Sequence, residues 1–151
     1  MPIFETSVTL DCPRERAFDF LLRPANVARI APPDLGLSFT RAPEIVELGS
    51  RIEFKVQGFG QVQTMVHEIT ELVHPRQITE RQIRGLFASW VHEHRFETND
   101  RGQVIVIDRI DFNPPAGLLG LLITAKRILE QLEDGFDHRH QQLHELLAAT
   151  A

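Results

Sequence analysis

The hydrophobic pattern of this chain changes its period at Asn113–Pro115. From residue 51 to residue 112, polar and apolar residues alternate in short runs, which is typical of strands with one wet and one buried face. From there to Leu147, apolar residues recur every three or four positions, which is typical of an amphipathic helix. Because proline cannot donate to a strand ladder, the two prolines should end the sheet. The pattern therefore predicts an antiparallel sheet followed by one long helix that begins near Leu118.

The first third of the chain predicts a strand and two short helices. Residues Ile3–Leu10 alternate as a strand does. Pro13 suits the first turn of a helix, and apolar residues follow it at helical spacing for about ten residues. A second short helix should run from Pro24 to Ile30, where two further prolines stop it.

Six more strands should follow, starting near Leu37 and ending at Phe112, with glycine-containing turns at residues 58–60 and 99–102. With the first strand this makes about seven. The order of elements predicts an α+β fold in which a curved antiparallel sheet wraps around the long C-terminal helix, with two short helices after the first strand. At 151 residues the chain is long enough for one domain, and we expect residues 1–151 to form it.

Composition and charge exclude several classes of function. A formal net charge of -5 gives no basic footprint for nucleic acid, so we expect no nucleic-acid partner. The longest apolar run, at residues 117–124, is too short to cross a membrane. The N-terminus lacks the pattern of a secretion signal, and Cys12, the one cysteine, cannot form an internal disulfide. By elimination we expect a cytoplasmic protein.

Three segments resemble a known group of proteins. They are the strand and helix at residues 7–21 with the Pro24-Ala25-Asn26 that follows, the strand GLFASWVHEHRF at residues 85–96, and DRIDFNPPAG at residues 108–117. Together with the order of elements, they resemble the START-like (SRPBCC, helix-grip) superfamily, which includes the plant pollen-allergen fold, lipid-transfer domains and polyketide cyclases. The resemblance implies a helix-grip fold with an internal cavity for a small hydrophobic molecule, and it covers nearly the whole chain.

Polar residues interrupt the apolar faces of the last two predicted strands. Alternation places Trp90, His92, His94 and Phe96 on one face, which should be the buried one. Asp108 stands between Val106 and Ile110 on the inner face of the next strand. An ionised carboxylate is costly to bury alone, so Asp108 should pair with a histidine, meet water in a cavity or hold a ligand.

Three more polar residues share inward positions on neighbouring strands: His67, Glu80 and Gln82. We expect the polar group to converge on one end of an apolar cavity, where it contacts a ligand. The candidate ligand-binding residues are His67, Glu80, Gln82, Trp90, His92, His94, Phe96 and Asp108. The alternative is a buried, mutually satisfied network that fixes strand register.

Metal binding is a weaker interpretation of the same residues. His92 and His94, two apart on a strand, could present two imidazoles to one ion, with Asp108, Glu80 or His67 as a third ligand. This spacing also arises from ordinary strand patterning, and a second pair, His140 and His144, suits a solvated helix face. We therefore expect no metal and no other cofactor.

Three hypotheses of function follow. The first is binding of a small hydrophobic molecule in a cavity between sheet and helix. The second is an enzyme of the cyclase or dehydratase kind with a cavity histidine as general base, although the absence of tyrosine excludes any mechanism that needs its hydroxyl. The third is a protein-interaction module with a filled core, which could act as a homodimer. Only the third predicts that no cavity exists.

Overall fold

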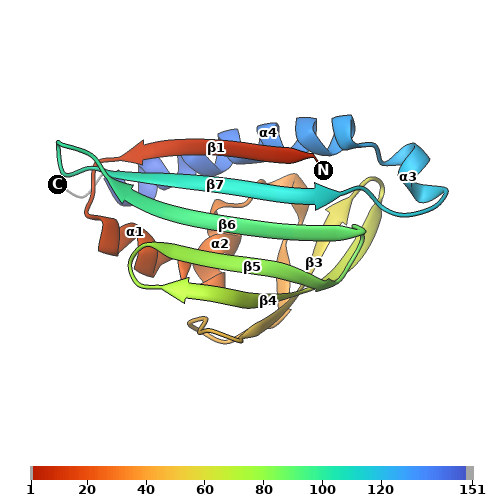
Figure 1. The fold of residues 1–151 in the computed structure, drawn as a ribbon, viewed down its shortest axis with the longest axis horizontal. Coiled ribbons are helices and arrows are strands. Elements are labelled where there is room, and N and C mark those ends of the chain that lie inside the picture. The colour runs from red at the N-terminus through yellow and green to blue at the C-terminus, as the bar shows by residue number, and fades with distance from the viewer. Residues whose placement is uncertain (1, 149–151) are drawn as a thin grey trace.

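The alternating segments form an antiparallel sheet in the computed structural model, which describes residues 2–148 (Figure 1). Its strands are β1 (Ile3–Leu10), β2 (Ser38–Arg41), β3 (Arg51–Gly58), β4 (Gln61–Val73), β5 (Gln77–Arg84), β6 (Ser89–Thr98) and β7 (Val104–Asn113). Their order across the sheet is β1-β7-β6-β5-β4-β3-β2, so β2 to β7 form a meander and β1 joins its far edge. Over residues 2–148 the structure confirms the seven predicted strands.

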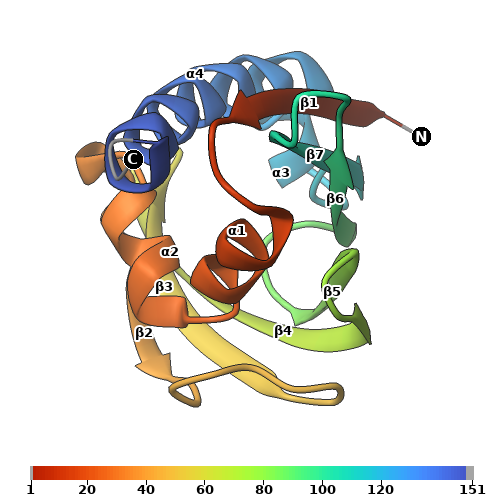
Figure 2. The same ribbon diagram turned by 90° about the vertical axis from the view of Figure 1, so that its left-hand side faces the viewer.

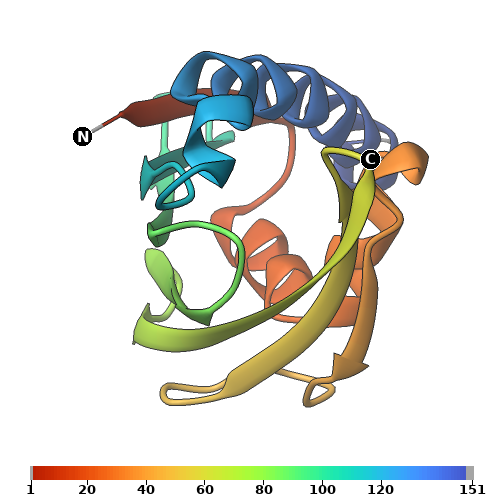
Figure 3. The same cartoon turned by 90° about the vertical axis from the view of Figure 1, so that its right-hand side faces the viewer.

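Helices lie inside the curve of the sheet and at its two ends. They are α1 (Arg14–Leu21), α2 (Pro24–Ile30), the 3-10 turn η1 (Pro33–Leu35), α3 (Leu119–Leu122), α4 (Ala125–Leu143) and the π-helical turn η2 (His144–Ala148). The end-on view in Figure 2 shows α1 and α2 at one end of the curve, with α4 running along the molecule. Figure 3 shows α3 at the opposite end. The two predicted short helices after the first strand are thus confirmed.

Apolar side chains from sheet and helices meet in two clusters. One includes Phe18 of α1 and Phe96 of β6, whose rings meet edge-on with centroids 5.0 Å apart, together with Leu143 of α4. The other joins Phe112 of β7 to Ile128 and Phe136 of α4. Edge-to-face aromatic contacts of this kind stabilise a core beyond the burial of their area. The two clusters anchor α4 against the sheet.

The predicted start of the C-terminal helix, near Leu118, is wrong. Its long part begins at Ala125, and residues 118–122 form a separate short turn in which Leu118 and Leu121 are 83% and 74% exposed. The physical reason is local: Thr124 leaves helical geometry and its side chain accepts a hydrogen bond from the Arg127 N–H, which caps α4. Ile123 turns inward and is buried. Leucine spacing alone continues the helical pattern, so it could not reveal this break.

Candidate functional site

A cavity of about 700 Å³ lies between α4 and the inner face of the sheet. Most of its wall is apolar and comes from α2, α4 and β2 to β6, including Val27, Phe39, Phe54, Val56, Met65, Trp90, Ile128 and Leu132. Exposed lining residues mark its mouth: Gln131 and Asp134 of α4, Asp34 of η1 and Gln57 of β3. The polar lining residues that are buried mark its inner end.

The inner face of β6 brings two histidines to this inner end. His92 and His94 are buried and line the cavity, whereas the intervening Glu93 points to the other face. Their ring centroids are only 3.7 Å apart because residues two apart on a strand share one side. The face assignment of the sequence analysis is therefore confirmed for both residues.

Asp108 lies behind the two imidazoles rather than in the cavity wall. It is fully buried on β7, opposite His94 in the strand register. His92 Nε2 donates a hydrogen bond of 2.8 Å to Asp108 Oδ1. His94 Nδ1 lies 2.7 Å from the same oxygen, in an ion-pair contact that is poorly angled for a hydrogen bond. The carboxylate thus holds one nitrogen of each ring and leaves the other nitrogen facing the cavity side.

Glu80 occupies the side of the histidines opposite Asp108. Its Oε1 is 3.3 Å from His94 Nε2 and 3.5 Å from His92 Nδ1. Its Oε2 is 3.1 Å from Nδ1 of His67 on β4. The carboxylate side chain is largely buried, and it lines the cavity together with His67. The structure therefore brings together five of the eight predicted residues in one polar cluster: His67, Glu80, His92, His94 and Asp108.

The cluster divides charge unequally between its members. Burial disfavours the charged form of both carboxylates. For Asp108, the Arg139 guanidinium and His94 outweigh burial and hold the pKa well below its usual range. For Glu80, the hydrogen bonds from His67 and His94 do the same. Burial lowers the pKa of His92 to about 4. Burial also opposes charge on His94, but the Asp108 and Glu80 carboxylates outweigh it and raise the pKa of that ring. Of these two rings, His94 is therefore the one on which the surrounding carboxylates favour a positive charge.

Arg139 of α4 is the main residue that the sequence analysis missed. Its Nη2 lies 3.9 Å from Asp108 Oδ1, and its guanidinium stands 5.2 Å from the centre of the Phe136 ring. A signal for it existed, because Arg139 is three residues after Phe136 and seven after Leu132, on the apolar face of the helix. The partner could not be inferred, since it depends on how α4 docks against β7.

Two predicted residues have other roles in the structure. The Gln82 side chain donates to the Phe87 carbonyl at 2.7 Å and accepts from the Phe87 N–H at 3.3 Å, so it anchors the loop between β5 and β6. Phe96 belongs to the core beside Phe18. Neither residue lines the cavity. Trp90, by contrast, does line it and stacks on Phe87 with ring centroids 4.6 Å apart.

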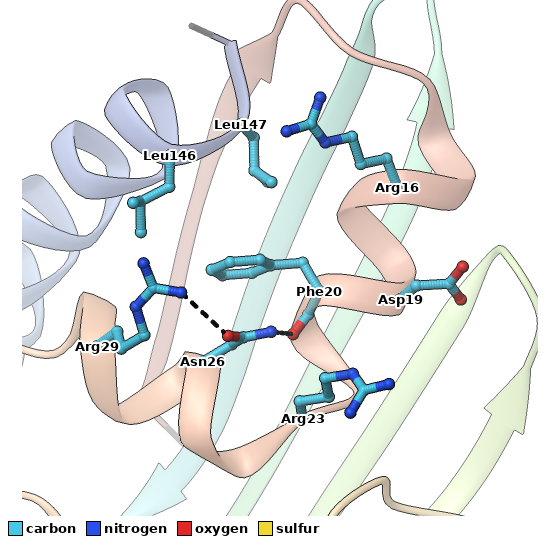
Figure 4. Close-up of a pocket in the computed structure, with 8 residues that line it drawn as sticks. All are labelled: Arg16, Asp19, Phe20, Arg23, Asn26, Arg29, Leu146 and Leu147. Carbon is cyan, nitrogen blue, oxygen red and sulfur yellow. Dashed lines mark hydrogen bonds between the residues drawn. The ribbon is translucent and has the colours of Figure 1, made fainter. Parts of the chain in front are cut away.

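A second depression of about 310 Å³ lies on the outside of the molecule, between α1, α2 and η2 (Figure 4). Arg16, Arg23 and Arg29 lie around it, and Asn26 joins its two sides by donating to the Phe20 carbonyl at 3.0 Å. Arg29 also donates to Asn26, at 3.5 Å. The described polar residues that line this depression are all exposed or half-buried, so the inner cavity is the stronger candidate site.

Cys12 is not a candidate nucleophile. Its side chain is buried, and burial raises the pKa of the thiol, which disfavours the reactive thiolate.

Among the described residues, the groups that could hold a metal ion are Glu80, His92 and His94, whose ligand atoms all lie within 4.8 Å of one another. The chemistry available in the cavity is therefore that of imidazole and carboxylate.

Comparison with known proteins identifies the architecture. No protein-family model matches the chain, and no curated protein matches it in sequence. Solved structures do match. Protein CV1439 from Chromobacterium violaceum aligns with a TM-score of 0.74 at 16% identity, covering 98% of this chain and 99% of its own. This chain has the helix-grip fold.

Two further helix-grip structures show what else shares this scaffold. Major latex-like protein 151 from Panax ginseng aligns with a TM-score of 0.67 at 15% identity, covering 95% of this chain and 97% of its own. The di-domain ARO/CYC StfQ of the steffimycin biosynthetic pathway aligns with a TM-score of 0.68 at 16% identity, covering 97% of this chain and 50% of its own. Identities this low establish the fold and no activity. Within residues 2–148, no helix of this helix-grip chain is both long and apolar enough to cross a membrane.

Proposed function

We propose that this chain binds a small, largely apolar molecule that carries a hydroxyl or carbonyl group. The observation behind the proposal is the cavity itself, with apolar walls and one buried polar cluster at its inner end. Its volume of about 700 Å³ lies within the range of small-molecule sites, which is roughly 300–1,000 Å³. The apolar walls would supply affinity, and Glu80 and His94 would select the polar group.

The cavity disfavours the filled-core interaction module, which requires that side chains occupy this space. The enzyme alternative has one observation in its favour, the hydrogen bond between His92 and Asp108, which orients a ring as a general base needs. Against it, the pKa of His92 is lowered to about 4, so this imidazole is a weak base near neutral pH. StfQ, an ARO/CYC, has the same fold, but a shared fold does not carry a mechanism. Binding is the function that the site supports best.

A fluorescent apolar probe tests the cavity directly. N-phenylnaphthylamine is uncharged and emits strongly only when it leaves water, so a titration with the full chain should show saturable emission at one probe per chain. Leu132→Trp should weaken this binding, because Leu132 lines the cavity and the larger side chain would fill part of it. Leu121→Ser is the matched control, since Leu121 is exposed and does not line the cavity. Absence of saturable emission, or equal binding by the Leu132 variant, would contradict the proposal.

A further inference from the structure

We infer that Glu80, His92 and His94 form a binding site for one divalent transition-metal ion, with zinc as the best match. Glu80 comes from β5 and the two histidines come from β6, and one ligand atom of each lies within 4.8 Å of the other two. This inference goes beyond the binding of an organic molecule and does not depend on it, because the site consists of protein atoms alone.

The distances between the ligand atoms suit a tetrahedral ion. Glu80 Oε1 lies 3.3 Å from His94 Nε2 and 3.5 Å from His92 Nδ1. For metal–ligand bonds of about 2.0–2.1 Å in tetrahedral geometry, neighbouring ligand atoms are roughly 3.3 Å apart. Two sides of the ligand triangle therefore have the required length already. The two imidazoles are tilted by 31° with ring centroids 3.7 Å apart, and the ligand atoms of the three residues all lie within 4.8 Å of one another.

Asp108 prepares both histidines as ligands. Since a carboxylate only accepts hydrogen bonds, the hydrogen on His92 sits at Nε2, and Nδ1 of the neutral ring carries a free lone pair. For His94 the contact with Asp108 is at Nδ1, so Nε2 is the nitrogen directed to the site, where it is hydrogen-bonded to Glu80 Oε1 at 3.3 Å. A metal-bound histidine usually donates a hydrogen bond from its other ring N–H to a carboxylate, a backbone carbonyl or water. Asp108 is thus a positioning residue behind the two ligands.

His67 prepares Glu80 in the same manner. Its Nδ1 contacts Oε2 of Glu80 at 3.1 Å, which leaves Oε1 directed between the two histidines. In the metal-free structure a proton lies between His94 Nε2 and Glu80 Oε1, which are 3.3 Å apart. Without that proton, three acceptor atoms would face one another in a buried place, where they repel unless a cation lies among them. A proton can take that place, and so can a metal ion.

The surrounding charges favour a cation. With neutral imidazoles, the described groups at the cluster are the negative Glu80 and Asp108 and the positive Arg139, so one negative charge remains. Histidines of α4 complete the surroundings: His138 lines the cavity, and His140 stands near Phe136. The exposed carboxylates Asp34 and Asp134 line the mouth through which an ion would enter.

Three protein ligands leave a fourth position on the ion. Glu80, His92 and His94 all line the cavity, so that position would face its interior. A metal ion there would bind the oxygen of a hydroxyl or carbonyl group and polarise it as a Lewis acid. The apolar wall would hold the rest of such a molecule.

Calorimetric titration of the chelator-treated full chain with zinc chloride alone tests the site. We expect one zinc per chain for the wild type. Glu80→Gln and His94→Ala each remove a ligand, so each should weaken zinc binding by more than the roughly 10–100-fold typical of outer partners. His144→Ala should bind zinc as the wild type does, because this exposed histidine lies outside the cavity. Circular dichroism of each variant checks that it is folded.

Zinc binding that is absent in the wild type, or unchanged in both ligand variants, would overturn the inference. Loss of binding in His144→Ala would do so too, because it would move the site to the second histidine pair. If the ligand variants fail to fold, wild-type crystals soaked in zinc decide the matter. An anomalous peak bonded to Glu80, His92 and His94 supports the inference, and a peak elsewhere or none contradicts it. None of these outcomes bears on probe binding in the apolar part of the cavity.

Discussion

Asp108 is the residue on which the polar cluster depends. It is fully buried, its Oδ1 contacts both His92 and His94, and Arg139 supplies the nearby positive charge. We expect Asp108→Asn to lower the free energy of unfolding by roughly 3–5 kcal/mol, because it breaks a buried ionic network and leaves Arg139 without its carboxylate. Urea denaturation of the metal-free protein measures this. Asp137→Asn, an exposed change on α4, should alter stability little.

The same carboxylate should make stability depend on acid. The pKa of Asp108 is held well below its usual 3.8, so in acid the unfolded chain binds a proton that the folded protein does not. The stabilisation is present above that usual value and is lost as pH falls through the lower folded value. We expect the free energy of unfolding to fall less steeply between about pH 5 and pH 3 in Asp108→Asn than in the wild type. Equal slopes would show that another group dominates.

Much of the cluster could be predicted residue by residue. Strict alternation fixed the inward faces of His67, His92 and His94, because a strand places every second side chain on one side. It could not give the partners, since those depend on register between strands. Arg139 was missed because its contact joins a helix to a distant strand. Gln82 shares an inward position, but a nearby loop takes its hydrogen bonds.

At the scale of elements, the C-terminal region combines a buried helix with an exposed leucine turn. The leucine period runs unbroken through both, yet α3 ends before Ile123 and α4 starts after Thr124. Periodicity predicts that a helix forms and not where a capping side chain ends it. The strand boundaries were predicted better, because glycine turns and prolines mark them in the sequence.

A pair of substitutions tests whether the leucine turn α3 is exposed while α4 is buried. Leu121→Ser replaces a leucine that is mostly exposed, so we expect a change in unfolding free energy within about 0.5 kcal/mol. Leu143→Ala empties a fully buried position at the end of α4, so we expect a loss of about 2–5 kcal/mol. Thermal and urea unfolding of both variants gives the comparison. Similar losses for the two would mean that residues 118–122 pack inward, as the leucine period alone predicts.

At the scale of the whole molecule, the order of elements was the strongest predictor. A strand, two helices, a six-strand meander and a terminal helix leave few ways to bury every apolar face, and the helix-grip arrangement is one of them. The cavity could not be predicted in the same way. Whether a space remains between sheet and helix depends on side-chain packing, which periodicity does not describe. The polar residues placed inside the curve were the indirect sign of it.

The central claim is that the cavity binds an apolar molecule and selects it by one polar group. The most direct measurement compares naphthol with methylnaphthalene, matched in ring and position of the substituent, by calorimetric titration of the wild-type chain. A hydrogen bond to a charged group contributes about 1.5–3 kcal/mol, so naphthol should bind roughly 10–100-fold more tightly. In Glu80→Gln this preference should shrink. Equal affinity for the two molecules in the wild type, or failure of both to bind, would contradict the account.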